Sequence, residues 1–205
     1  MTKTIEELLT EQNSSAAEET TILDTEIKEE TPAEETPIAE TPVSEAQVVD
    51  NYTSDNVIEL LKKSLNIHWQ QTTSLSAQAV HLERWGYKKL AEIIRKDAKE
   101  EHEHAMVNLT RLEFFDKDYQ PLVVSPLSWT RHDMLAMIKY NLDSVREASA
   151  AERATIVAAR AVGDEMTANI MIPLLQGSED GIVLYEGFLK MIEQMGLDNF
   201  LSIQV

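Results

Sequence analysis

The residues best suited to chemistry in this chain are Glu101 and His104, three positions apart, together with His68. With Ile94 as the centre of the apolar stripe of its helix, Glu101 falls about 20° from that centre at 100° per residue. A carboxylate in a buried stripe must be protonated, paired or bound to a metal, because an unpaired buried charge is very costly. The i, i+3 spacing also brings His104 to the same side of the helix.

His68 lies in the inward stripe of the preceding helix, between Leu65 and Leu75. Across a helical core it would face Glu101 and His104. Two imidazoles and one carboxylate are a donor set that leaves coordination positions open on Fe(II). The chain has no cysteine, so any metal must be held by His, Asp and Glu. The alternative is that both histidines are core residues, hydrogen-bonded to Glu101 without a metal.

Four long runs of apolar residues at steps of three and four position these side chains. We expect a first helix of about 28 residues that follows Ser54 as N-cap and ends at Trp85, and further helices over residues 87–115, 131–161 and 164–195. Gly86, Gly163 and Gly196 separate or close these helices. The inward stripes of the third and fourth runs are expected to be apolar or neutral. A short fifth helix or tail follows Gly196.

The link between the second and third runs, residues 116–129, contains two prolines and predicts an extended loop. Fourteen residues at ~3.3 Å each can run the length of a helix. Four helices joined by short, long and short connections indicate an all-α, ferritin-like four-helix bundle with one long crossover loop. One core is expected, over residues 54–205.

The net charge of −18 is unevenly distributed. Residues 1–55 hold 15 acids against two lysines, and the repeats ETPAE, ETPIA and ETPVS place Thr-Pro at every fifth position. Proline and like-charge repulsion both oppose helix formation, so residues 1–53 are predicted to be a disordered acidic tail, whose partner is unknown.

This charge argues against nucleic acid and anionic membranes as partners, since both attract clusters of Lys and Arg. No apolar run approaches the ~20 residues of a membrane span, and the N-terminus lacks the pattern of a secretory signal. We therefore expect a cytoplasmic protein. Among the other histidines, His81 and His132 are expected to be exposed near helix ends, and His102 to lie at a subunit contact.

Four segments of the bundle are informative together: RWGYKKL at 84–90, the Glu-x-x-His-Ala pattern at 101–105, RLEF at 111–114 and IEQMGLDNFL at 192–201. Through these segments, residues 57–205 resemble bacterioferritin. This resemblance implies a subunit that dimerises, assembles into a hollow cage, oxidises Fe(II) at a di-iron site inside each subunit and stores ferric mineral.

The family's site takes one Glu from each of helices one and three, and one Glu-x-x-His from each of helices two and four. Glu101 and His104 match the second helix. By position, His68 replaces the helix-one Glu and Val145 the helix-three Glu, while Ser178 and Gly181 replace the last pair. The resemblance therefore implies a partly degenerate centre, and we predict a single non-haem iron site of His68, Glu101 and His104.

The family's haem lies between two subunits on a methionine, at the position of His102. Haem is not expected here, because Thr72, Ser76, Arg95 and Lys99 make the surrounding pocket polar.

The first predicted function is a bacterioferritin-like, iron-binding cage subunit with ferroxidase-type Fe(II) oxidation at the intrasubunit site, if it is active. The second is a non-catalytic ferritin-like structural or interaction protein that displays the acidic tail. A DNA-binding miniature ferritin is a third reading, and the acidic tail opposes it.

Overall fold

The computed structural model describes residues 52–117 and 133–205. Over these ranges the chain is helical, with α2 (Ser54–Trp85), α3 (Lys88–Phe114), α4 (Met134–Ala161), α5 (Glu165–Met195) and the short α6 (Leu197–Ser202). This confirms the predicted all-α class, with four long helices and a short fifth one. The predicted disorder of the acidic tail and nearly all of the predicted crossover loop lie outside the described residues.

Side-chain caps set where the helices begin. Thr53, one residue before the predicted N-cap, caps α2: its hydroxyl accepts from the Asn56 backbone N–H, and its own N–H donates to the Asn56 side chain. Asp133 and Asp164 cap α4 and α5 by accepting from backbone N–H groups three residues on.

The turn between α2 and α3 depends on Gly86, as the sequence predicted. Its φ of +93° lies in the left-handed region, which costs a side-chain-bearing residue free energy and glycine almost none. The short turn returns α3 antiparallel along α2.

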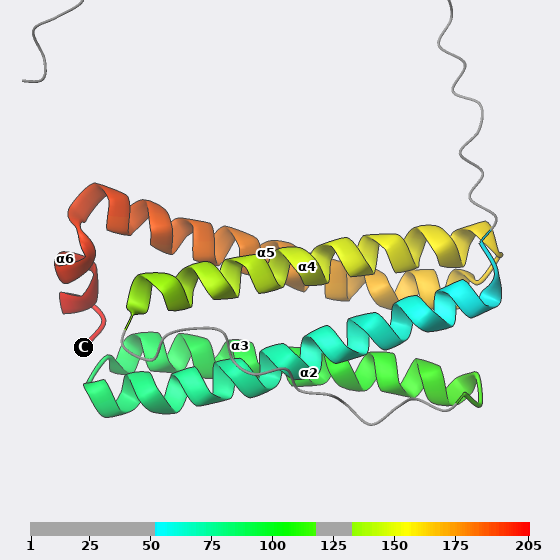
Figure 1. The fold of residues 1–205 in the computed structure, drawn as a ribbon, viewed down its shortest axis with the longest axis horizontal. Coiled ribbons are helices and arrows are strands. Elements are labelled where there is room, and N and C mark those ends of the chain that lie inside the picture. Colours follow the sequence, from blue (N-terminus) through cyan, green and yellow to red (C-terminus); the bar gives the residue numbers. More distant parts are fainter. Residues whose placement is uncertain (1–51, 118–132) are drawn as a thin grey trace, which may run out of the picture. The chain divides into compact units, whose positions relative to one another are not determined.

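The four long helices form two antiparallel pairs, α2 with α3 and α4 with α5 (Figure 1). Helix α3 ends at the opposite end of the bundle from the start of α4, so α3 and α4 run in the same direction (Figure 1). This is the up-down-down-up arrangement predicted from the connection lengths.

A polar layer at mid-bundle separates the two larger apolar clusters of the described residues. One cluster, toward α6, includes Leu82, Ile94 and Tyr185; the other, toward the opposite end, includes Leu61, Leu112 and Met171. Along each long helix, the residues between these clusters include a buried polar side chain: His68, Glu101, Glu152 and Ser178. The packed apolar clusters on either side hold this layer away from solvent.

Candidate metal centre

Glu101 is the central carboxylate of the polar layer. It lies on α3, is only 3% exposed, and places Oε2 2.6 Å from Nδ1 of His68 on α2. The same oxygen lies 3.7 Å from Nδ1 of His104, one helical turn further along α3. The structure therefore brings together the three residues that the sequence predicted to share a site.

Their arrangement suits a metal ion. One donor atom from each of His68, Glu101 and His104 can be chosen so that all three lie within 4.8 Å of one another. The two imidazoles meet edge to face, with ring centroids 5.2 Å apart. Nδ1 of His104 is buried, and no described residue forms a hydrogen bond with it. A buried nitrogen that lacks such a partner is a good candidate ligand atom, so the donor set fits a cation.

Sequence reasoning missed Glu152. The inward stripe of α4 was expected to be apolar or neutral, but Glu152 is fully buried there. Its Oε1 lies 3.2 Å from Nε2 of His68 and accepts a hydrogen bond of 3.1 Å from Ser178 on α5. Steps of three and four from Leu142 through Val145 and Ser149 lead directly to Glu152. The helical periodicity alone could therefore have placed Glu152 on the inward stripe.

Burial and charge shift the pKa values of His68 and Glu101 in opposite directions. Burial lowers the pKa of His68, but its contacts with the carboxylates of Glu101 and Glu152 outweigh burial and raise the pKa to about 9. Burial raises the pKa of Glu101, but its contacts with His104 and His68 outweigh burial and lower the pKa to about 2. At neutral pH, in the absence of a metal, His68 is therefore a positive imidazolium, and it lies between the side chains of Glu101 and Glu152.

Asp97 is a half-buried carboxyl group close to the candidate ligands. It lies one turn before Glu101 and accepts a hydrogen bond from the buried Tyr185 on α5. Burial raises the pKa of Asp97 to about 6, against the lowering effect of the Tyr185 hydrogen bond; the charges of Glu101 and Glu100 add to the rise.

A groove between α3 and α5, of about 410 Å³, reaches the site from the surface. Its polar lining is mostly acidic, with Asp97, Glu100, Glu101 and Asp180 against Lys96. Gly177 on α5 makes room for His104, because a Cβ built at position 177 would lie 2.7 Å from Cε1 of that imidazole. Through the exposed edge of His104, this groove would give a cation access to the candidate ligands.

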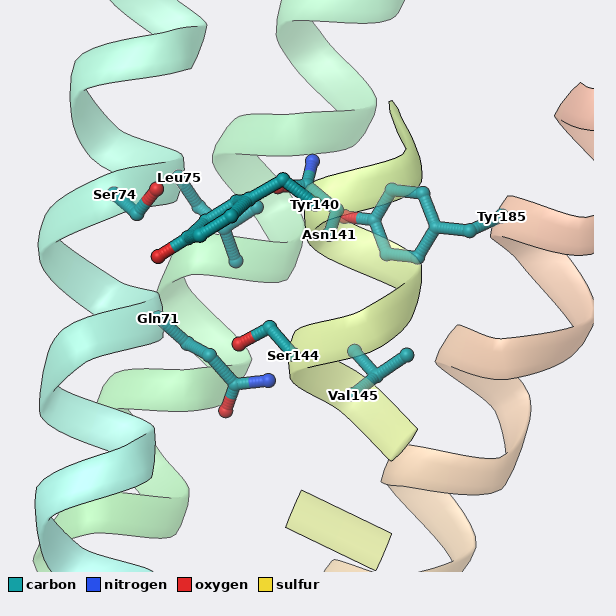
Figure 2. Close-up of a pocket in the computed structure, with 8 residues that line it drawn as sticks. All are labelled: Gln71, Ser74, Leu75, Tyr140, Asn141, Ser144, Val145 and Tyr185. Atoms are coloured by element: carbon teal, nitrogen blue, oxygen red, sulfur yellow. The ribbon is translucent and has the colours of Figure 1, made fainter. Parts of the chain in front are cut away.

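A second, much smaller cavity of about 10 Å³ lies between α2 and α4, one turn beyond His68. Gln71 and Ser144 point toward one another across it, and Tyr185 reaches in from α5 (Figure 2). Neither polar side-chain atom of the buried Gln71 has a hydrogen-bond partner among the described residues. The cavity is about the size of one water molecule.

The expectation that His81 is exposed was wrong. His81 is only 6% exposed. Its imidazole packs on the ring of Trp85 near the end of α2, with the two ring centroids 3.9 Å apart. His102 is exposed and lies edge-on to Trp69. His132 lies outside the described residues.

Fold and site together define a helical bundle with a buried His/Glu cluster, and the comparison with protein families agrees with this class. The ferritin-like domain family matches residues 58–195, and the chain belongs to that family. No curated protein matches the chain by sequence. Over the described ranges, none of the helices combines the length and apolarity needed to cross a bilayer.

Proposed function

We propose that this chain is a bacterioferritin-like cage subunit that binds a single iron ion through His68, Glu101 and His104. The observation that carries the proposal is the convergence of these three side chains in a buried layer, with donor atoms within 4.8 Å of one another. Membership of the ferritin-like domain family, which includes iron storage proteins, supports iron as the metal.

Each residue would have a distinct task. Glu101 supplies the negative charge that offsets the cation, and the histidines supply neutral nitrogen ligands, a set that suits Fe(II). His68 must release its Nδ1 proton to bind a metal, so binding displaces a proton. Bound Fe(II) would be the substrate for oxidation by O₂ or peroxide.

The acidic groove between α3 and α5 supports the same proposal, because it leads a hydrated cation to Glu101 and His104. We extend the proposal to the organisation of the chain: residues 54–205 form the cage-building bundle, and residues 1–53 an acidic arm outside it. By family resemblance, pairs of bundles assemble into a closed homo-oligomer.

The test is anaerobic titration of the purified chain with Fe(II), followed by addition of oxygen. We expect one Fe(II) per chain and oxidation faster than in buffer alone. Glu101→Ala should abolish stoichiometric binding. Glu103→Ala is the matched control, because it removes the same charge from the exposed face of the same helix, and it should bind like the wild type. Binding that survives Glu101→Ala would show that iron is held elsewhere.

One observation favours a second function. Without a metal, His68 already lies between two carboxylates that partly satisfy it. A non-catalytic ferritin-like subunit, whose core is held by this ion network and whose role is interaction through its acidic arm, would have the same cluster. A wild-type chain that assembles but binds no Fe(II) would support this second function.

A further inference from the structure

Glu152 is the one member of the buried charged cluster without a role in the proposed metal centre. It lies on α4, on the opposite helical pair from the three proposed ligands, and is fully buried. A buried carboxylate is retained at a large desolvation cost unless it is paired and hydrogen-bonded. Its contacts should therefore indicate what it does.

Those contacts are incomplete. Oε1 accepts from the Ser178 hydroxyl at 3.1 Å and lies 3.2 Å from Nε2 of His68. The contact with Nε2 is close enough for an ion pair but is not aligned as a hydrogen bond, and Oε2 has no hydrogen-bond partner in the described part of the chain. Glu152 thus has unused capacity to accept a hydrogen bond, and His68 has a nitrogen beside it.

The two ring nitrogens of His68 lead to different carboxylates. Nδ1 lies toward Glu101, at 2.6 Å, and Nε2 toward Glu152. A neutral imidazole has one N–H and one lone pair, so a metal bound at Nδ1 requires the proton on Nε2. The acceptor beside Nε2, which is Glu152, then fixes both the tautomer and the rotation of the His68 ring.

We propose that Glu152 is a positioning residue: it accepts the Nε2–H of His68 and thereby directs Nδ1 at the metal shared with Glu101 and His104. Carboxylates that orient ligating histidines in this way raise the basicity of the ligand and fix its rotation. Ser178 holds the carboxylate in place from α5. The inference rests on the proposed metal centre and adds a contribution from the α4–α5 pair to it.

The experiment uses Co(II) as a spectroscopic probe, titrated anaerobically into the full chain, with affinity and the visible d–d absorption of the bound ion as readouts. Glu152→Leu removes the acceptor, and Glu152→Met is a second apolar variant. Glu152→Gln keeps a side-chain oxygen that can accept the Nε2–H. Thermal unfolding of each metal-free variant reports separately on structure.

We expect Glu152→Leu and Glu152→Met to weaken Co(II) binding about 10- to 100-fold and to alter the absorption spectrum. Both should stay folded without metal, because His68 keeps its hydrogen bond to Glu101, but they should unfold at a lower temperature than the wild type, because one partner of a buried ion pair is removed. Glu152→Gln should recover the wild-type spectrum, with affinity within about threefold of it. A variant that is folded at the temperature of the titration but has a defective site separates positioning from a merely structural role.

Two results would overturn the inference and leave the metal centre intact. Wild-type affinity and spectrum in the apolar variants would show that Glu152 does not act on the metal. A spectrum altered as strongly by Glu152→Gln as by Glu152→Leu would make Glu152 a direct ligand. If instead the wild type binds no Co(II), or Glu101→Ala binds as tightly as the wild type, the metal centre itself fails, and this inference with it.

Discussion

His68 has an imidazole enclosed between the carboxylates of Glu101 and Glu152, and this arrangement links its protonation to folding. Its pKa is raised to about 9 in the folded chain from an ordinary value of 6.5. The folded state therefore holds the proton more tightly than the unfolded state. The resulting stabilisation is complete below pH 6.5 and is lost as the pH rises through about 9.

Metal-free wild type should accordingly lose unfolding free energy between pH 6.5 and 9, by roughly 3 kcal/mol if the raised pKa acts alone. Urea unfolding at several pH values measures this change. His68→Gln, which cannot take up the proton, should show a flat profile over the same interval. Equal slopes in the two proteins would show that another group is responsible.

Gly177 gives a second prediction at the residue scale. A methyl group there would lie 2.7 Å from Cε1 of His104, so Gly177→Ala should displace the imidazole and weaken Fe(II) binding at least tenfold. The displaced atom is the far end of a side chain, so the bundle should stay folded. Calorimetric titration with Fe(II) measures the loss.

Gly187→Ala is the matched control, because a Cβ built there has no described atom within 4 Å apart from its chain neighbours and the backbone of its own helix. Alanine in place of glycine inside a helix should stabilise the bundle by about 0.5–1 kcal/mol and leave Fe(II) binding unchanged. Unchanged binding in Gly177→Ala as well would mean that His104 is not a ligand.

At the scale of elements, the α2–α3 pair supplies all three proposed ligands, and the α4–α5 pair covers them with Glu152, Ser178 and Gly177. The two pairs are tied together at one end. Arg111, near the end of α3, donates to Asp164 and Thr167 at the start of α5. Asp164 also caps α5, so one carboxylate serves both a helix end and the contact between pairs.

Asp164→Ala should therefore destabilise more than loss of a cap alone. Removal of an N-cap costs about 1 kcal/mol, and leaving the mostly buried Arg111 without its carboxylate adds about 1–3 kcal/mol. Asp133→Ala removes the cap of α4 and should cost only the first amount. Denaturant unfolding of both variants gives the comparison, and equal losses would contradict a role for Asp164 between α3 and α5.

Some features of these elements could be predicted from the sequence, and others could not. Helix ends and the proximity of Glu101 and His104 on α3 were predictable, because glycine turns, apolar steps and the i, i+3 spacing are local properties. Glu152 was missed because the position matched by resemblance was Val145, one heptad earlier on the same stripe. His81 was misplaced because its cover, the ring of Trp85, depends on side-chain packing that spacing alone does not specify.

At the scale of the whole molecule, the two larger apolar clusters of the described residues lie on either side of a polar layer. Each of the four long helices contributes at least one buried polar side chain to this layer. The clusters supply the stability, since burial of apolar surface is the dominant favourable contribution to folding. The layer between them can therefore retain charged groups whose burial is costly. This division is what a bundle needs in order to hold an ion near its centre.

The most direct test of the central claim is to locate iron in crystals of the full chain loaded anaerobically with one equivalent of Fe(II), by anomalous scattering at the iron absorption edge. The account predicts one peak per chain, within bonding distance of His68, Glu101 and His104. Iron bound only on the surface, or a mid-bundle layer in which His68 remains paired with both carboxylates and holds no iron, would contradict it.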